Sequence, residues 1–473
     1  MPTVRQFTMQ DQRRFASLSG DSNPMHMDAV AARRTTAAVP VVHGIHNLLW
    51  CLEVIAEALG ELPPVSSLRV NFDTFVAVGE TVEAVLLKRD AAGLRAVVRA
   101  AGITALTVAL GFGEVQANAT AIGGEGEPFD GKEPLELTLE QMTVRVGRVS
   151  LATPEAAMGE AFSHAARLLG ETRVAGLGCL TRLVGMVCPG LNSIFNGLSL
   201  KAYRAPQDGE AGIAYRVSQF DPRYRRLVQD VSGCGWIGTV TCCARQPPTQ
   251  QPSLEFLSGL VAPDEFRGST ALVVGGSRGL GELTAKLIAA GGGRVIVTYA
   301  TGRADAEILA QSINAAGGVA STLCYDVLKE PGSQLVAVQV APTHIYYFAT
   351  PTIASRQSAV FSADRFAQFI AFYLTGFVNL LDALSERRPD GMRVFYPSTV
   401  FIEDRPNGMT EYAMAKAAGE VLCADLTKDR PSVRIEAQRL PRLPTDQTAS
   451  LHSVETGDPV AVLLPIIRML HAS

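Results

Sequence analysis

The chain has 473 residues, too many for one hydrophobic core, and we expect about three domains. Its formal net charge is -4 and its Lys and Arg residues form no cluster, which excludes a nucleic-acid-binding footprint. The first residues lack a signal-peptide core and no stretch reaches about 18 uninterrupted apolar residues, so we expect a soluble cytoplasmic protein without a membrane span. The eight cysteines and seven histidines show no metal-ligand spacing, which predicts reduced thiols and no metal site.

The most informative segment runs from Phe15 to Asp28, where Asp21 stands five residues before His26. Asn23-Pro24 between them disfavours a regular helix, so the acid and the imidazole share a short turn. Such a pair can hold a water and move its protons in both directions, which is general acid and base catalysis. A helix is predicted to begin at His43-Gly44, where unpaired N–H groups could polarise a carbonyl oxygen. These features predict the addition or removal of water next to a thioester.

This segment resembles the signature of the MaoC-like and (R)-specific enoyl thioester hydratases and dehydratases. The similarity extends through Ala32 to Thr35, Ser67 to Phe72 and Val76 to Thr81. The resemblance implies that Asp21 and His26 carry the protons. It also implies that Asn23 orients them, that the N–H of Gly44 binds the thioester oxygen, and that the substrate is an acyl-CoA or acyl carrier protein thioester. The alternative is a polar turn in which His26 only packs or caps a helix.

A helix predicted over residues 45–59 is apolar on nearly every side, ends at Gly60 and must be buried. Strands rich in Val and Leu are predicted to follow at 65–72, 80–88, 94–100 and 103–112. A sheet around one buried helix is the hotdog fold that the resemblance implies, and we assign it residues 1–125. His46 on this helix is expected to be a core residue.

A second unit of similar size is predicted over residues 138–245, after a glycine-rich bridge. Its capped helix begins at Thr153-Pro154, and a later apolar helix covers residues 177–187. Residues 189–196 follow that helix much as residues 64–71 follow the first one, which indicates a weak internal repeat. Because the acid-Asn-Pro-His motif does not recur, we interpret this unit as a second hotdog half that has lost its chemistry, as in eukaryotic relatives of the family.

Other polar residues of the second unit have two interpretations each. His164 is expected to pack rather than to catalyse. Arg223, Arg225 and Arg226 form a solvated loop, or they meet the phosphates of coenzyme A or an acidic carrier protein. A proline-rich stretch then begins a linker, which we assign to residues 246–267.

From residue 268 to 473, short apolar strands alternate with helices, the pattern of a doubly wound parallel sheet. The strand at 270–274 runs into a glycine-rich loop that lets the backbone approach a pyrophosphate at the next helix start. The residues predicted to bind a cofactor in this loop are Gly275, Ser277, Arg278, Gly279, Leu280 and Gly281. The predicted fold class is therefore an α+β double hotdog followed by an α/β Rossmann-type domain.

Tyr412 and Lys416, preceded by Ser398-Thr399, complete a resemblance to the short-chain dehydrogenase/reductase family over residues 268–460. The resemblance implies that Tyr412 donates a proton to the substrate oxygen, while Lys416 lowers the pKa of this tyrosine and holds the ribose. It implies that Thr399 or Ser398 orients the carbonyl, and the spacing fits Thr399 slightly better. Asp326 matches the aspartate that contacts adenine in the family.

The predicted cofactor is NADP(H). The strand at 295–299 ends without the acid that would bind a free ribose 2′-hydroxyl, and Arg278 and Arg303 could meet a 2′-phosphate. The domain also departs from its family at three sites. Residues 347–350 replace the usual Asn-Ala-Gly, Tyr373 stands at the position of the proton-relay asparagine, and Arg442 replaces a glycine after Pro441. Despite these changes we expect the domain to bind a nucleotide, but the changes put its turnover as a reductase in question.

Three hypotheses follow. The first is a bifunctional enzyme of fatty acid or polyketide-type metabolism that combines an NADPH-dependent 3-ketoacyl reductase with a 3-hydroxyacyl dehydratase or enoyl hydratase. The second is a dehydratase whose reductase-like domain is a non-catalytic nucleotide-binding or docking module. The third is a structural or carrier-binding protein, against which Asp21 and His26 argue. The sequence leaves open the acyl chain, the carrier and the formation of a homodimer.

Overall fold

The computed structural model describes residues 3–117, 122, 128–204, 212–353, 360–388, 390–446 and 456–472. The first compact unit comprises residues 1–247, and the second comprises residues 248–449 and 454–473. Part of the predicted linker belongs to this second unit. Helix α9 (Leu254–Ser258) places Leu257 in the core, together with Val261 and Phe266. Apolar burial therefore outweighs the proline-rich composition that predicted an extended linker up to residue 267.

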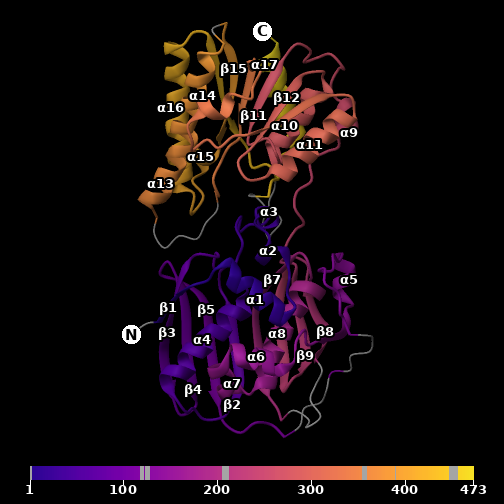
Figure 1. Ribbon diagram of the computed structural model, residues 1–473, viewed down its shortest axis with the longest axis vertical. Helices are drawn as coiled ribbons and strands as arrows, with labels where there is room; N and C mark the ends of the chain where they lie inside the picture. The colour runs from indigo at the N-terminus through magenta and orange to yellow at the C-terminus, as the bar shows by residue number, and fades with distance from the viewer. Residues whose placement is uncertain are drawn as a thin grey trace. The chain divides into compact units, whose positions relative to one another are not determined.

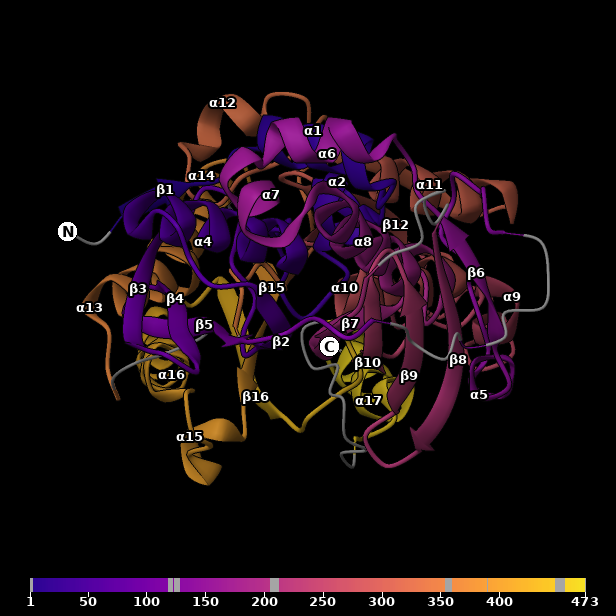
Figure 2. The same cartoon turned by 90° about the horizontal axis from the view of Figure 1, so that it is seen from below.

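Within its described residues, the first unit forms one ten-stranded antiparallel sheet that curves around helices α4 (Gly44–Leu59) and α8 (Glu171–Arg182) (Figure 2). The strand order is β1-β3-β4-β5-β2-β7-β10-β9-β8-β6. In chain order the strands are β1 (Thr3–Gln6), β2 (Val65–Phe72), β3 (Thr81–Asp90), β4 (Gly93–Ala100), β5 (Ile103–Phe112), β6 (Val146–Ser150), β7 (Ser193–Ala202), β8 (Gly212–Asp221), β9 (Arg226–Gly233) and β10 (Trp236–Ala244).

The two halves of this sheet repeat one strand order. The order β1-β3-β4-β5-β2 is followed in reverse by β7-β10-β9-β8-β6, and β2 pairs with β7 where the halves meet. One buried helix, α4 or α8, precedes the strand of each half that lies at this junction, β2 or β7. The segments that suggested the weak repeat, residues 64–71 and 189–196, lie at these two junction strands. The interpretation of each half as a hotdog domain stays a prediction.

The two central helices are buried for different reasons. Helix α4 is apolar at most positions and ends at Gly60, which has φ +66°. Helix α8 is less apolar, but its glycines allow close packing, since a Cβ at Gly178 would lie 2.4 Å from the terminal carbon of Met158. It continues into the π-helical turn η1 (Leu183–Val187). The remaining helices of this unit are α1 (Met9–Ser19), α2 (Pro24–Met27), α3 (Ala29–Ala32), α5 (Leu139–Thr143), α6 (Glu155–Ala161) and α7 (Ser163–Leu169).

The described part of the second unit contains a six-stranded parallel sheet with helices on both sides (Figure 1). Its order, β13-β12-β11-β14-β15-β16, is that of a dinucleotide-binding Rossmann sheet and confirms the predicted α/β domain. The strands are β11 (Thr270–Val274), β12 (Arg294–Tyr299), β13 (Val319–Cys324), β14 (His344–Tyr347), β15 (Met392–Thr399) and β16 (Val433–Leu440). Besides α9, the described helices of this unit are α10 (Gly279–Ala290), α11 (Arg303–Ala315), α12 (Pro331–Leu335), α13 (Ala363–Ile370), η2 (Ala371–Thr375), α14 (Gly376–Ser385), α15 (Phe401–Asp404), α16 (Thr410–Asp429) and α17 (Pro459–His471).

Successive side chains of the central strand β11 point to opposite faces of this sheet and join two separate hydrophobic cores. Ala271 and Val273 join the core beneath α10, α11 and α17, whereas Leu272 and Val274 join the core beneath α14 and α16. The continuous segment Ala363–Ser385 is long and apolar enough to cross a membrane by length and composition. Its residues Phe377 and Leu381 are buried in the second of these cores, as expected for a helix that covers a sheet.

Two histidines are stacked in the second unit. The rings of His344 and His471 have centroids 3.8 Å apart and planes 4° apart. Burial lowers the pKa of His344 to about 4 and that of His471 to about 3, from an ordinary value of 6.5. The unfolded chain therefore binds more protons than the folded chain below pH 6.5. The stability that this neutral pair contributes is present above pH 6.5 and is lost as the pH falls.

We predict that His344→Phe, which keeps a ring against His471, makes the second unit less sensitive to acid. Both tryptophans, Trp50 and Trp236, lie in the first unit, so calorimetry compared with tryptophan fluorescence identifies the unfolding of the second. Removing one linked proton should reduce the pH dependence of its unfolding free energy by up to roughly 1.4 kcal/mol per pH unit between pH 6.5 and about pH 5. An unchanged pH dependence would contradict the assignment.

Candidate functional site

The predicted acid and imidazole lie on the loop and short helix that follow α1. Helix α1 ends at Gly20, which has φ +74°. Asn23 then caps α2 through its side chain, with Pro24 in the first turn. The side chains of Asp21 and Asn23 are buried, and His26 is half-buried. Asp21 therefore lies on a loop, but His26 lies in the one-turn helix α2 and not in the turn that Asn23-Pro24 predicted, because proline is favourable in the first turn of a helix. The two side chains still lie close together.

The Asp21 carboxylate accepts hydrogen bonds from helix α8, in the second half of the first unit, and from its own loop. Thr181 of α8 donates its hydroxyl hydrogen to Asp21 Oδ2 at 2.7 Å, and the backbone N–H of Asn23 donates to Oδ1 at 3.2 Å. A Cβ at Gly185 would lie 2.4 Å from Asp21 Oδ1, so only glycine permits this approach. Burial raises the pKa of Asp21, while the charge of His26 and these two hydrogen bonds act in the opposite direction.

Asn23 attaches the loop with Asp21 to the second half of the first unit. Its side-chain amide donates to the carbonyl oxygens of Gly185 at 2.8 Å, Gly190 at 3.2 Å and Leu191 at 3.3 Å. These three contacts hold the loop with Asp21 to the second half, and the orienting role that the resemblance implies for Asn23 stays a prediction. The second half was predicted to have lost its chemistry. Its own acid and imidazole are absent from the sequence, but it supplies Thr181 directly to the carboxylate of the other half.

His26 is oriented by its backbone partner and by a second ring. Its Nδ1 lies 2.8 Å from the carbonyl oxygen of Val41, so Nδ1 carries a hydrogen and, in the neutral ring, the lone pair is on Nε2. The ring stacks on His43 with centroids 3.9 Å apart. Donor atoms of Asp21, His26 and His43 lie within 4.8 Å of one another, a spacing that by itself would suit a metal ion. Two stacked, nearly parallel imidazoles do not direct their lone pairs at one ion, and the absence of a metal stays a prediction.

Gly44 is the first residue of the long, buried helix α4. N–H groups in the first turn find no acceptor in their own helix, and the positive end of the helix dipole adds to them. A Cβ at Gly44 would lie 2.9 Å from the Phe72 ring, so a side chain here would collide with that aromatic wall. The acid Asp21 and the imidazole His26 thus lie beside His43, the residue that precedes the start of α4. An acid, an imidazole and a helix start are the groups needed to add water beside a carbonyl.

We predict that Thr181→Val slows this chemistry without blocking substrate binding. Loss of the hydroxyl removes an interaction that lowers the pKa of Asp21, so burial should raise this pKa further. The pH profile of hydration should move to higher pH, and kcat should fall by about 10-fold with KM nearly constant. Thr239→Val on β10 is the matched control. An unshifted pH profile would show that Thr181 is not coupled to the carboxylate.

The glycine-rich loop of the second unit has the shape of a dinucleotide cradle. Gly275 and Gly279 have φ +74° and +59°, and a Cβ at Gly281 would lie 2.4 Å from the Gly275 carbonyl oxygen. Ser277 is buried in the loop, and Leu280 follows in the first turn of α10. At Gly275 and Gly281 a side chain would collide with backbone atoms of the protein, so glycine allows the tight turn at the start of a twelve-residue helix, an arrangement that fits a pyrophosphate group.

Charged residues predicted to meet the adenosine half each have a partner. Arg278 Nη1 lies 3.2 Å from Asp446 Oδ2, a buried carboxylate that sequence reasoning missed. Arg303 pairs with Glu307 at 2.7 Å on an exposed surface. Asp326 accepts a hydrogen bond from the N–H of Leu328 at 3.1 Å. The Arg303 pair is solvent-exposed and therefore weak, so this arginine can exchange its partner for a phosphate.

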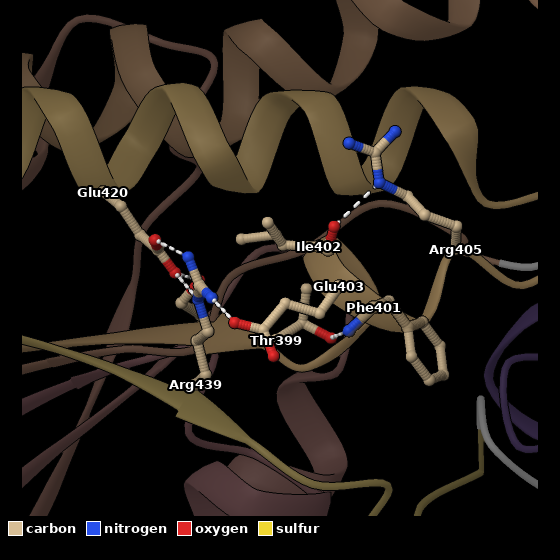
Figure 3. Close-up of polar contacts among 8 residues, drawn as sticks. Thr399, Phe401, Ile402, Glu403, Arg405, Glu420 and Arg439 are labelled. Atoms are coloured by element: carbon tan, nitrogen blue, oxygen red, sulfur yellow. Dashed lines mark hydrogen bonds and ion pairs between the residues drawn. The ribbon is translucent and has the colours of Figure 1, made fainter.

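The structure separates the roles of the two hydroxyl candidates. Thr399 forms a hydrogen bond with Tyr412 that lowers the pKa of this phenol, against burial, which raises it to about 12. Ser398 instead donates to Glu420. Figure 3 shows Arg439 between Glu420 and Glu403, and the Thr399 hydroxyl beside the N–H of Phe401. Thr399 is therefore the residue beside the predicted proton donor.

Lys416 is buried between a backbone carbonyl oxygen and two aromatic rings, and the role that the resemblance implies for it stays a prediction. Its Nζ donates to the carbonyl oxygen of Pro397 at 2.6 Å and lies 3.9 Å from the Tyr373 ring centroid and 4.8 Å from that of Tyr396. Burial lowers the pKa of Lys416 to about 7, so part of the lysine population is uncharged at neutral pH. Tyr373, which replaces the relay asparagine, thus covers the ammonium that should lower the pKa of Tyr412.

Comparisons with known proteins agree with this division of the chain. The model of a MaoC like domain matches residues 2–109, and the model of a short chain dehydrogenase matches residues 269–453. An uncharacterized oxidoreductase of Methylorubrum extorquens is 40% identical over 63 residues, 13% of this chain, and this match spans only 25% of that relative.

Solved structures also match part of the chain. A gluconate 5-dehydrogenase from Burkholderia cenocepacia with NADP and tartrate is 21% identical, with a TM-score of 0.36 over 39% of this chain and 76% of that one. A 3-oxoacyl (acyl-carrier-protein) reductase from Agrobacterium tumefaciens with NADP is 24% identical, with a TM-score of 0.36 over 39% and 75% of the two chains. The two family matches identify the chain as a MaoC-like domain at residues 2–109 joined to a short-chain dehydrogenase domain at residues 269–453.

Proposed function

We propose that the first unit interconverts 3-hydroxyacyl and 2-enoyl thioesters by removing or adding water. The observation that carries this proposal is the buried Asp21 carboxyl beside His26, at the start of α4. His26 Nε2 has a lone pair for a proton because Nδ1 is engaged by Val41. In dehydration one of the two groups takes the proton next to the carbonyl and the other gives a proton to the departing hydroxyl. The N–H of Gly44 stabilises the charge that develops on the thioester oxygen.

The second unit reduces a 3-ketoacyl thioester to the 3-hydroxyacyl thioester in this proposal. The glycine cradle at residues 275–281 holds the pyrophosphate of NADPH, and Arg303 binds its 2′-phosphate. The bound cofactor supplies the hydride. Thr399 orients the ketone and Tyr412 gives its oxygen a proton. The product is then the substrate of the first unit, on coenzyme A or on a carrier protein, which would make the chain a two-step enzyme of acyl-chain metabolism.

A second candidate function is supported by the surroundings of Lys416. A lysine that is buried against Tyr373 and Tyr396 gives little help in ionising Tyr412. In this alternative the second unit binds the nucleotide without transferring hydride, and only the first unit is an enzyme. The two candidates share the hydration chemistry and differ only in the turnover of NADPH.

For the first unit we predict that Asp21→Asn and His26→Ala each lower hydration of an enoyl thioester by at least about 10²-fold, the usual contribution of a general acid or base. The decrease is measured from the loss of enoyl absorbance on both carriers. His164→Ala is the matched control, because His164 lies near the surface of α7 beside Arg167 and should leave the rate unchanged. A hydration rate near that of the wild type in either Asp21→Asn or His26→Ala would contradict the assignment of that residue as a general acid or base.

For the second unit we predict oxidation of NADPH by a 3-ketoacyl thioester, with a loss of about 10²-fold or more in Tyr412→Phe while hydration is kept. Arg303→Ala should raise KM for NADPH more than KM for NADH, because the 2′-phosphate loses its cation. Tyr373→Asn should increase turnover by uncovering Lys416. If the wild type binds NADPH but oxidises it no faster than Tyr412→Phe does, the second candidate function is correct.

A further inference from the structure

His43 contacts both residues that carry protons in the proposed reaction. Its Nε2 lies 3.0 Å from the carbonyl oxygen of Asp21, and its ring stacks on that of His26. The side chain of His43 is completely buried, and the residue is the N-cap of α4, directly before Gly44. One fixed residue therefore adjoins the acid, the imidazole and the predicted oxyanion N–H.

Gln12 of α1 fixes His43 in turn. Its Oε1 accepts a hydrogen bond from the backbone N–H of His43 at 3.1 Å and lies 2.9 Å from His43 Nδ1. The backbone N–H needs an oxygen as acceptor, and this requirement sets the orientation of the Gln12 amide. Gln12 Nε2 then points to His46 Nδ1, 3.4 Å away. The buried amide thus ties α1 to the first turn of α4.

We propose that Gln12 and His43 are positioning residues, a clamp that holds Asp21, His26 and the N–H of Gly44 in the mutual geometry needed for hydration. This inference rests on the hydration function proposed above. With a hydrogen on Nε2, His43 donates to the Asp21 carbonyl and fixes the direction of the loop that carries the carboxylate. The face of its ring supports the His26 orientation in which Nδ1 meets Val41.

His43 is not itself a carrier of protons to the substrate. Both of its ring nitrogens face oxygen atoms of the protein, those of Gln12 and Asp21. Burial lowers the pKa of His43 well below its usual value, and the neighbouring His26 and His46 act in the same direction. His26, in contrast, is half-buried and has one nitrogen without a role in the clamp. Of the two stacked rings, His43 therefore positions the site and His26 transfers the proton.

The test uses the full chain with the changes Gln12→Leu, Gln12→Glu and His43→Phe. Gln12→Leu removes the acceptor of the His43 backbone N–H and the side chain beside His43 Nδ1, and we expect kcat for enoyl thioester hydration to fall by about 10-fold to 100-fold with KM changed less than about 3-fold. Gln12→Glu keeps a carboxylate oxygen that can accept the hydrogen bond of the His43 backbone N–H, so it should recover most of kcat. His43→Phe keeps the ring against His26 but loses the donor to Asp21, and it should resemble Gln12→Leu.

His46→Leu is the matched control for this test. His46 lies on the same turn of α4, is equally buried, stacks on Phe15 and touches Gln12, but it contacts neither Asp21 nor His26. It should lower the unfolding temperature and leave kcat per folded molecule unchanged, with folding followed through Trp50 on α4. If Gln12→Glu does not fold, His43→Asn, whose amide can donate to the Asp21 carbonyl, replaces it as the rescue and is compared with His43→Phe.

The outcomes separate the clamp from the proposed function. An active wild type whose Gln12→Leu and His43→Phe variants keep its kcat would overturn the clamp and leave the hydratase assignment standing. Equal losses of kcat in His46→Leu, or no recovery in the rescue variant, would show that packing alone is involved and would also overturn the clamp. A wild type without hydration on either carrier would overturn the proposed function and the clamp together.

Discussion

The hydrogen bond from Thr181 to the Asp21 carboxylate joins the two halves of the first unit at the point of its proposed chemistry. A carboxylate that is fully buried is costly unless it is hydrogen-bonded, so the loop with Asp21 depends on the helix that lies 160 residues later in the chain. The continuous ten-stranded sheet, with β2 paired to β7, keeps that helix in place. The second half is thus a necessary part of the site although it lacks the acid and imidazole.

The sequence predicts those parts of this site that lie close together in the chain. Asp21, Asn23 and His26 share one turn, and proline and the apolar run after Gly44 indicate where the chain turns and where the helix begins. Gln12 and Thr181 could not be predicted, because a glutamine or threonine inside an ordinary helix has no pattern of its own. Their roles depend on which helices meet, and tertiary packing decides this.

The second unit shows the same division. The alternation of strands and helices, together with the glycine-rich loop, predicted a Rossmann-type sheet. The glycines were a usable signal because the loop needs positive φ values, such as +74° at Gly275, which favour glycine. The partner of Arg278 could not be predicted, because Asp446 follows the last strand of the sheet, far away in the chain. The spacing of residues along a helix also could not predict which side chains surround the Lys416 ammonium group. Its spacing from Tyr412 is kept, yet aromatic rings from η2 and β15 surround its ammonium group.

The central claim is that the first unit adds water across a 2-enoyl thioester with protons moved by Asp21 and His26. The most direct measurement is the configuration and isotope content of the product that the full chain forms from a trans-2-enoyl thioester in ²H₂O. Our account predicts a 3-hydroxyacyl thioester with one deuterium at C2, formed on at least one of the two carriers, in the (R) configuration that the resemblance to the (R)-specific hydratases implies. A product of (S) configuration, or no addition of water on either carrier, would contradict it.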